Sequence, residues 1–205
     1  MDWQRILYSV PAVILGLTVH EFCHAWAAHK LGDDTAKEQG RVSFNPLRHI
    51  DPIGLAFIVF AGFGWAKPVQ FSLERLGSPR RDKALIAASG PLSNLLVGIL
   101  LTLIIRLLLR TEFGGNSIAY VHLFLFLYYA ASINLGLFVF NILPIPPLDG
   151  SHIFFSGLNL SPETEYRIMR IGAPLLFILI IVSNSTGIDI LPIGKAVGAI
   201  MRLFL

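Results

Sequence analysis

The 205 residues are 54% hydrophobic and only 14% charged, with a mean hydropathy of +0.67. This composition excludes a soluble globular domain, and several apolar runs approach or exceed the roughly 20 residues that a bilayer-spanning helix requires. The net charge of +3 comes from basic residues in loops between the apolar runs, so it indicates membrane topology and not nucleic-acid binding. The single cysteine, Cys23, excludes an internal disulfide.

The apolar runs predict an all-α polytopic membrane protein. Residues 6–31 form the first span, and because no small-residue cleavage site follows it we expect a retained span and not a signal peptide. Two more full spans are expected at residues 84–109 and 118–143, and a further span at residues 166–182. Ser161 or Thr164 is suited to cap that last helix.

Two shorter segments complete the predicted architecture of about five to six hydrophobic segments. Residues 53–65 are too few to cross a bilayer comfortably, and their glycines and aromatic residues predict a short re-entrant extended hairpin. The amphipathic tail, residues 193–205, either lies at the interface or completes a last crossing. We expect one domain over residues 1–205, with C-terminal helices over about 164–205.

The basic residues orient these spans. Nine of them lie between the first and second full spans: Lys30, Lys37, Arg41, Arg48, Lys67, Arg75, Arg80, Arg81 and Lys83. If residues 53–65 re-enter, all nine share one side, which the positive-inside rule makes cytoplasmic. Gly115 is then outside, and the stretch PPLDG after the third span returns to the cytoplasmic side, at the same membrane face as HEFCH.

The stretch HEFCH places two histidines and a glutamate inside the first span. His20 and His24 are four residues apart, so on a helix both imidazoles project from nearly one face and can bind one metal ion, with Glu21 beside them to handle a water proton. The alternative is polar packing between helices. Burying a charged group at the centre of a membrane costs about 2.5–3.5 kcal/mol, so three ionisable groups together favour metal binding.

A catalytic zinc site usually has three protein ligands and a water, so a third ligand is needed. Asp149, in NILPIPPLDG, is the best candidate because it is expected at the same membrane face. Alternatively, it caps a helix beginning at GSHIFFSGL, or His152 competes as the ligand. The other polar residues considered have packing, turn or loop roles at least as plausible as metal contact: His29, His49, Asp51, His122 and Cys23.

HEFCH followed by NILPIPPLDG resembles the site-2 protease family of intramembrane zinc metalloproteases. That family combines HExxH with N-x-x-P-x-x-x-L-D-G, matched here by Asn141, Pro144, Leu148, Asp149 and Gly150. Three further stretches are similar to those of short prokaryotic members: GRVSFNPLRHIDPIG, GFGWAKPV and SGPLSNLLVG. The resemblance covers the chain to about Leu158 and implies a three-helix catalytic core over about residues 5–158, with no PDZ or CBS domain. It further implies one zinc ion bound by His20, His24 and Asp149, with Glu21 as general base.

The predicted function is a zinc-dependent intramembrane endopeptidase in the cell membrane, with the bilayer around it and transmembrane proteins as substrates. Asn141 and Asn94 are candidates to donate hydrogen bonds to the substrate or the oxyanion, although each can equally bridge two helices. GFGWAKPV either offers a strand edge to an unwound substrate or keeps lipid away from the metal. The alternative function is a non-proteolytic membrane metal-binding or metal-transport protein, against which the intact Glu21 argues.

Overall fold

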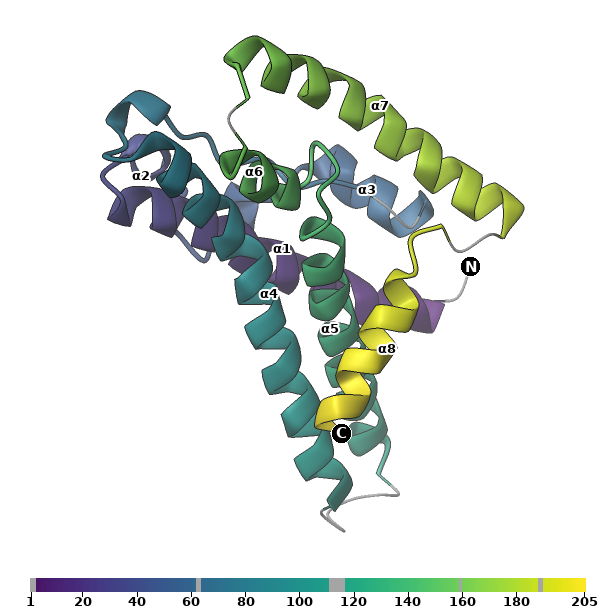
Figure 1. Ribbon diagram of the computed structural model, residues 1–205. Coiled ribbons are helices and arrows are strands. Elements are labelled where there is room, and N and C mark those ends of the chain that lie inside the picture. Colours follow the sequence, from purple (N-terminus) through teal and green to yellow (C-terminus); the bar gives the residue numbers. More distant parts are fainter. Residues whose placement is uncertain (1–2, 62–63, 111–116, 159, 188–189) are drawn as a thin grey trace.

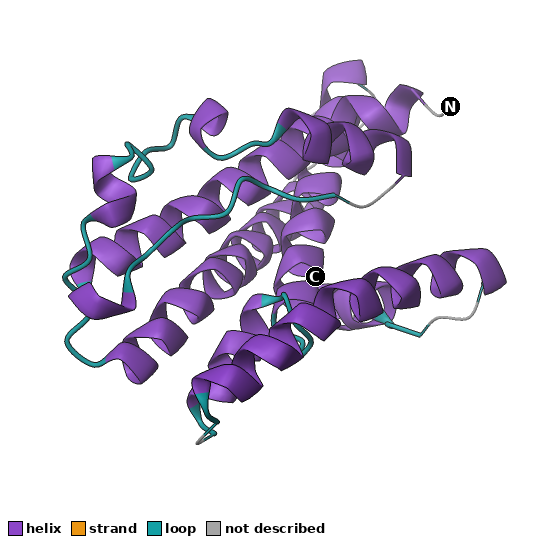
Figure 2. Ribbon diagram, turned by 90° about the horizontal axis from the view of Figure 1, so that it is seen from above, coloured by secondary structure: helices purple, strands orange, loops and turns teal. Residues whose placement is uncertain are grey.

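A computed structural model describes residues 3–61, 64–110, 117–158, 160–187 and 190–205. Within these ranges the chain is helical and contains no strand, as Figure 2 shows. Four helices there are long and apolar enough to cross a membrane: α1 (Trp3–Lys30), α4 (Pro79–Arg110), α5 (Ile118–Asn141) and α7 (Pro162–Thr186). The prediction of an all-α polytopic membrane protein is confirmed.

Helices α1, α4 and α5 pack against one another and form the centre of the molecule (Figure 1). Small residues allow this packing, because a Cβ at Gly98 of α4 would lie 2.6 Å from Leu135 of α5. On α1, a Cβ at Gly16 would likewise lie 2.8 Å from Leu137. Close helix contact without side-chain bulk is how bundles associate in lipid, where burial from water gives no driving force.

The C-terminal helix α8 (Ile193–Phe204) lies along α5 and α4 (Figure 1). Its Val197 and Met201 are buried in the apolar cluster that Ile105 and Leu135 share. At 12 residues, this helix is shorter than the roughly 20 that a crossing requires. The tail therefore covers the bundle from one side and does not complete a further span.

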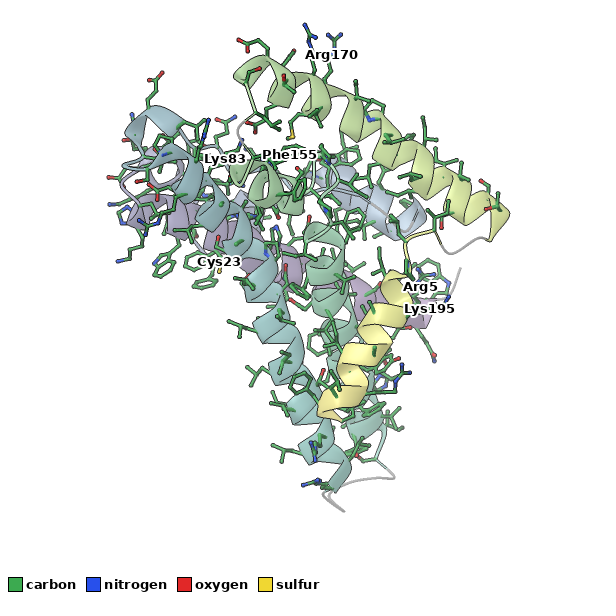
Figure 3. The ribbon with its side chains drawn as sticks, in the orientation of Figure 1. Arg5, Cys23, Lys83, Phe155, Arg170 and Lys195 are labelled. Atoms are coloured by element: carbon green, nitrogen blue, oxygen red, sulfur yellow. The ribbon has the colours of Figure 1, made fainter. Side chains whose placement is uncertain are left out.

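Helix α7 and the short helix α6 (Asp149–Ser156) lie at one end of the bundle (Figure 1). Ser161 caps α7 as predicted, since its hydroxyl oxygen accepts the Thr164 N–H at 3.3 Å. The α7 backbone lies close to the loop before α6, because a Cβ at Gly172 would come within 2.4 Å of Pro146. In Figure 3, Lys83 and Phe155 lie at this same end, whereas Arg170 points away from the bundle.

The segment predicted as an extended hairpin, residues 53–65, is helical over most of its length. Helix α3 runs Pro52–Ala61, and residues 62–63 lie outside the described ranges. The extended prediction was wrong because the start signals of a helix were stronger: Pro52 occupies its first position, and the Asp51 carboxylate accepts the Gly54 N–H at 2.8 Å.

The re-entrant path of this segment agrees with the structure. An isolated bridge pairs Ile50 with Ala66, so the chain returns beside the point at which it left. Gly54 permits the close return, since a Cβ there would lie 2.1 Å from the Trp65 carbonyl oxygen. The ten residues of α3 are also too few to cross a bilayer.

Three short elements lie in the loops before and after this segment. They comprise α2 (Thr35–Glu38) and the 3-10 turns η1 (Pro46–Arg48) and η2 (Leu73–Arg75). Asp33, which is fully buried, joins the two parts: its carboxylate accepts the Thr35 N–H at 2.9 Å and the Ser72 N–H at 2.6 Å. The extended stretch before Ser72 is thereby held near the C-terminal end of α1.

Candidate metal centre

Three predicted ligands converge at the junction of α1 and α6. His20 and His24 are one turn apart on α1, and both are buried. The His20 Nε2 lies 3.1 Å, and the His24 Nε2 3.4 Å, from Oδ2 of Asp149 at the start of α6. The two Nε2 atoms are 3.0 Å apart. The structure therefore joins residues separated by more than a hundred positions into one group that could hold a metal ion.

The donor set fits zinc. The Nδ1 atom of His24 lies 2.7 Å from the Ile86 carbonyl oxygen, which can only accept, so that nitrogen carries the proton. His20 Nδ1 similarly lies 2.6 Å from Oδ1 of Asn94. Two Nε2 lone pairs and a carboxylate oxygen thus face one another, an arrangement that a cation stabilises. Ligands at zinc–ligand distances of 2.0–2.2 Å in a tetrahedron would be about 3.3–3.6 Å apart, close to the spacings found.

Helix α4 approaches the two imidazoles at a glycine. A Cβ at Gly90 would lie 2.4 Å from His24 Nε2 and 2.8 Å from His20 Cε1. No side chain fits there without moving both rings. Pro91 follows directly, and both residues are buried against α1. Glycine at this position lets the α4 backbone pack directly against the two imidazole rings.

The turn before α6 aims Asp149 at the histidines. Leu148 occupies the N-cap position of α6, so the alternative in which Asp149 caps this helix is not what the structure shows. The turn requires a glycine next, because a Cβ at Gly150 would lie 2.2 Å from the Ile142 carbonyl oxygen. Asp149 is free to direct its carboxylate at the imidazoles from the first turn of the helix.

Glu21 is held by two groups from the loop that follows α1. Its Oε2 accepts the Val69 backbone N–H at 3.1 Å and lies 3.7 Å from Nη2 of Arg41. Arg41 is only 4% exposed and also donates to the Lys67 carbonyl oxygen. From the sequence, Arg41 was expected only to orient the spans. Its place in GRVSFNPLRHIDPIG, one of the stretches that carry the family resemblance, was the available signal.

A cavity of about 250 Å³ opens on this group. The residues lining it are His20, Glu21, His24, Pro68, Val69, Phe71, Ile86, Ala87, Asn141, Pro147, Asp149 and His152. Asn141 lines it, and its amide nitrogen donates to the Leu137 carbonyl one turn earlier on α5 at 3.0 Å. His152 lies in the wall and not in the ligand group, and its buried Nδ1 has no hydrogen-bond partner among the described residues.

Asn94 lies behind His20 and does not line the cavity. It is fully buried, and its amide bridges α4 to α1 and α5. This geometry favours the interhelical alternative for Asn94 over contact with a substrate.

The remaining polar candidates have partners away from the metal group. His49 is fully buried, and its Nε2 donates to the Ser43 carbonyl at 2.6 Å. Burial lowers the pKa of His49 below its ordinary value, and the positive charge of nearby Arg41 lowers it further. His29 pairs with Asp34 at 2.5 Å, and His122 is hydrogen-bonded to Tyr8. Asp51 caps α3, and Cys23 is half-buried on α1. These residues support the loop and the helices.

A ligand group of two histidines and an aspartate, with an adjacent glutamate inside a spanning helix, defines a membrane metallopeptidase of the H-E-x-x-H class. The chain belongs to peptidase family M50, whose model matches residues 8–179. The resemblance to site-2 proteases is thereby confirmed.

Curated relatives agree with the family. The chain is 40% identical over 148 residues to "Putative zinc metalloprotease YwhC" of Bacillus subtilis, covering 71% of this chain and 67% of the relative. It is 28% identical over 159 residues to "Putative zinc metalloprotease Rip2" of Mycolicibacterium smegmatis, covering 74% of this chain and 57% of the relative. "Zinc metalloprotease RasP" of Shouchella clausii is 39% identical over 62 residues, covering 27% of this chain and 15% of the relative. No solved structure matches significantly. The predicted class, a zinc metallopeptidase, is confirmed.

Proposed function

We propose that this chain is a zinc-dependent intramembrane endopeptidase of the cell membrane that cleaves transmembrane segments of membrane proteins. One observation carries the proposal: His20, His24 and Glu21 lie on a helix long and apolar enough to span a membrane, and together with Asp149 from α6 they line one cavity. A peptide bond must therefore reach the metal from within the membrane part of the molecule. Transmembrane segments are the peptides present there, and they must unwind locally to expose a carbonyl.

His20, His24 and Asp149 are assigned as the zinc ligands. Zinc bound there would polarise the scissile carbonyl and lower the pKa of a bound water. Each imidazole donates its Nδ1 proton to an acceptor on α4, which leaves Nε2 for the metal. The carboxylate of Asp149 supplies the one anionic ligand. The cavity beside them leaves room for a water and a carbonyl group.

Glu21 is assigned as the general base. The Val69 N–H and the Arg41 guanidinium face its Oε2, so we assign proton transfer to Oε1. Glu21 would take a proton from the attacking water and return it to the leaving nitrogen. Asn141 is assigned as a contact for the substrate backbone, because it lines the same cavity.

The active site is assigned to the cytoplasmic face. The chain enters and leaves α3 at neighbouring points, so the nine basic residues from the end of α1 to the first turns of α4 share one side. Single cysteines at Lys37 and Ser117, introduced into a Cys23→Ser background, test this assignment with an impermeant thiol reagent on intact cells. Lys37→Cys should be protected and Ser117→Cys labelled; labelling of only Lys37→Cys would reverse the orientation.

The proposed activity is tested with Glu21→Gln. This variant should keep its zinc, because all three ligands remain, yet cut a model transmembrane substrate slower by about 10²-fold or more. Glu74→Gln is the matched control, since Glu74 is exposed on η2 and away from the cavity. Cleavage by detergent-solubilised protein and zinc content are measured together. A Glu21→Gln protein that cuts at the wild-type rate would overturn the proposal.

A further inference from the structure

A line of buried hydrogen bonds runs from α5 through α4 to His20 on α1. It passes through Asn134 and Asn94, which are both fully buried. We call these two residues the asparagine relay. Asn134 Nδ2 lies 2.8 Å from the Ala130 carbonyl oxygen, and Asn134 Oδ1 lies 3.0 Å from Asn94 Nδ2. Asn94 Oδ1 then lies 2.6 Å from His20 Nδ1. The relay therefore crosses all three central helices.

The polarity of this line is fixed at its α5 end. The Ala130 carbonyl can only accept, so Asn134 must present its NH₂ group there and its oxygen to Asn94. That oxygen can only accept, so Asn94 must present its NH₂ group to Asn134 and its oxygen to His20. An oxygen facing His20 requires a proton on Nδ1. The unprotonated nitrogen of neutral His20 is consequently Nε2, which faces His24 and Asp149.

A second anchor fixes the same orientation. Asn94 Nδ2 also lies 3.0 Å from the Gly16 carbonyl oxygen, one turn before His20 on α1. A flipped Asn94 amide would place its oxygen against two acceptors in an environment without water, which is costly. The orientation of Asn94 therefore rests on two independent backbone carbonyls, one on α5 through Asn134 and one on α1.

We propose that Asn94, oriented by Asn134 and Gly16, is a positioning residue that fixes the His20 tautomer for metal binding. His24 needs no such residue, because its acceptor is the Ile86 backbone carbonyl. The relay makes His20 the one of the two imidazoles whose tautomer depends on a side chain. The inference deepens the proposed function, since it rests on His20 being a zinc ligand.

Two substitutions of Asn94 separate positioning from packing. Asn94→Asp keeps an acceptor for His20 Nδ1 but loses both donor contacts, to Gly16 and Asn134. Asn94→Leu has similar size and suits an apolar bundle, yet it offers His20 no acceptor. Zinc affinity is measured by competition with a chelator, and thermal unfolding is measured without zinc. We expect Asn94→Leu to lose roughly 10–100-fold in affinity, the usual effect of removing such a partner, and Asn94→Asp to lose much less.

A packing role predicts the reverse order, because Asn94→Asp places carboxylate oxygens against two acceptors, the Gly16 carbonyl and Asn134 Oδ1, whereas the apolar side chain of Asn94→Leu does not repel them. Equal zinc affinity in both variants, or a greater loss in Asn94→Asp, would overturn the inference. If Asn94→Leu fails to fold, the wild-type protein still decides the question. Its histidines, labelled with ¹⁵N, report the protonated ring nitrogen by NMR in the zinc-free state, with His20 assigned by comparison with His20→Gln. A proton on Nδ1 of His20 would support the relay, whereas a proton on Nε2 would overturn it.

The failure of the relay and the failure of the proposed function give different results. His20→Ala that binds zinc as tightly as wild type would remove His20 from the ligand set and so contradict the proposed site. The NMR measurement on the zinc-free protein does not depend on that outcome. If His20 carries its proton on Nε2 but is still required for zinc binding, only the asparagine relay is rejected.

Discussion

The backbone N–H of Val69 lies 3.1 Å from Oε2 of Glu21, which joins the extended stretch after α3 to the helix that carries two of the proposed metal ligands. The same oxygen faces Arg41 at 3.7 Å, and Arg41 in turn donates to the carbonyl of Lys67. Glu21 is thus oriented by a loop element that lies far from it in sequence. The loop between α1 and α4 is therefore a structural part of the proposed catalytic site, in addition to setting topology.

Arg41→Leu tests whether this orientation matters. It removes the buried cation beside Glu21 and the donor to Lys67 while leaving all three proposed ligands in place. We expect zinc content to stay at the wild-type level and cleavage of a model substrate to fall by about 10²-fold, the cost typical of a misplaced catalytic group.

Arg48→Leu is the control for Arg41→Leu, because Arg48 lies in the same loop but is exposed. Its cleavage rate should stay near wild type. Equal rates in both variants would show that Arg41 contributes to topology only.

Substitution of Asp149 tests the third ligand. Asp149→Ala should purify with substoichiometric zinc, and Asp149→Asn should bind zinc more weakly, because the anionic oxygen between the two imidazoles is gone. His152→Ala should keep its zinc and lose part of its cleavage activity, since His152 lines the cavity without joining the ligand group. Zinc stoichiometry in detergent distinguishes the two residues. Full zinc in Asp149→Asn, with loss in His152→Ala, would move the ligand to His152.

Much of the fold followed from the sequence because long apolar runs have few alternatives. The run at residues 84–109 became part of α4, and Ser161, one of the two predicted capping residues, caps α7. Only the extended conformation predicted for residues 53–65 was wrong, because short apolar runs suit a strand and a buried helix equally. There, Asp51 and Pro52 start the helix: Pro52 is its first residue, and the Asp51 carboxylate accepts the Gly54 N–H.

The metal group was predictable for a different reason. HExxH carries its geometry within five residues, and the family motif supplied Asp149. Arg41 and Asn134 were missed because their contacts, to Glu21 and to Asn94, join residues 20 and 40 positions apart in the sequence. A single sequence gives no distance between such residues, so only the folded chain could assign them.

Glycine at position 90 is expected to be required for metal binding. In Gly90→Ala the new Cβ would lie 2.4 Å from His24 Nε2, so the imidazoles or α4 must move. We expect loss of zinc affinity and a destabilisation of about 1–3 kcal/mol, the range for overpacking a closely packed interior. Chelator competition and thermal unfolding measure the two effects.

Gly136→Ala on α5 is the matched control for Gly90→Ala. A Cβ there meets nothing within 4 Å, so the same substitution should leave zinc affinity unchanged and slightly stabilise the helix. Zinc binding by Gly90→Ala at the wild-type affinity would contradict the described approach of α4 to the histidines.

Asp33 gives the loop a dependence on pH whose sign can be worked out. Burial alone would raise the pKa of this carboxyl group, but hydrogen bonds from Thr35 and Ser72 lower it below its ordinary value. A group with a lower pKa in the folded state stabilises the fold above its unfolded pKa of about 3.9, and this stabilisation is lost as the pH falls through the folded pKa.

The thermal unfolding midpoint of the wild type should therefore decrease as the pH is lowered below about 4. Asp33→Asn should be less stable by about 1–3 kcal/mol at neutral pH, because the charged acceptor is gone, and should show a smaller decrease on acidification. Asp34→Asn serves as the neighbouring control, because the Asp34 side chain is 48% exposed. Because Asp33 holds the stretch that reaches Glu21 through Val69, cleavage by Asp33→Asn at neutral pH should fall more than zinc content. An unchanged cleavage rate with a lowered midpoint would confine Asp33 to a stabilising role.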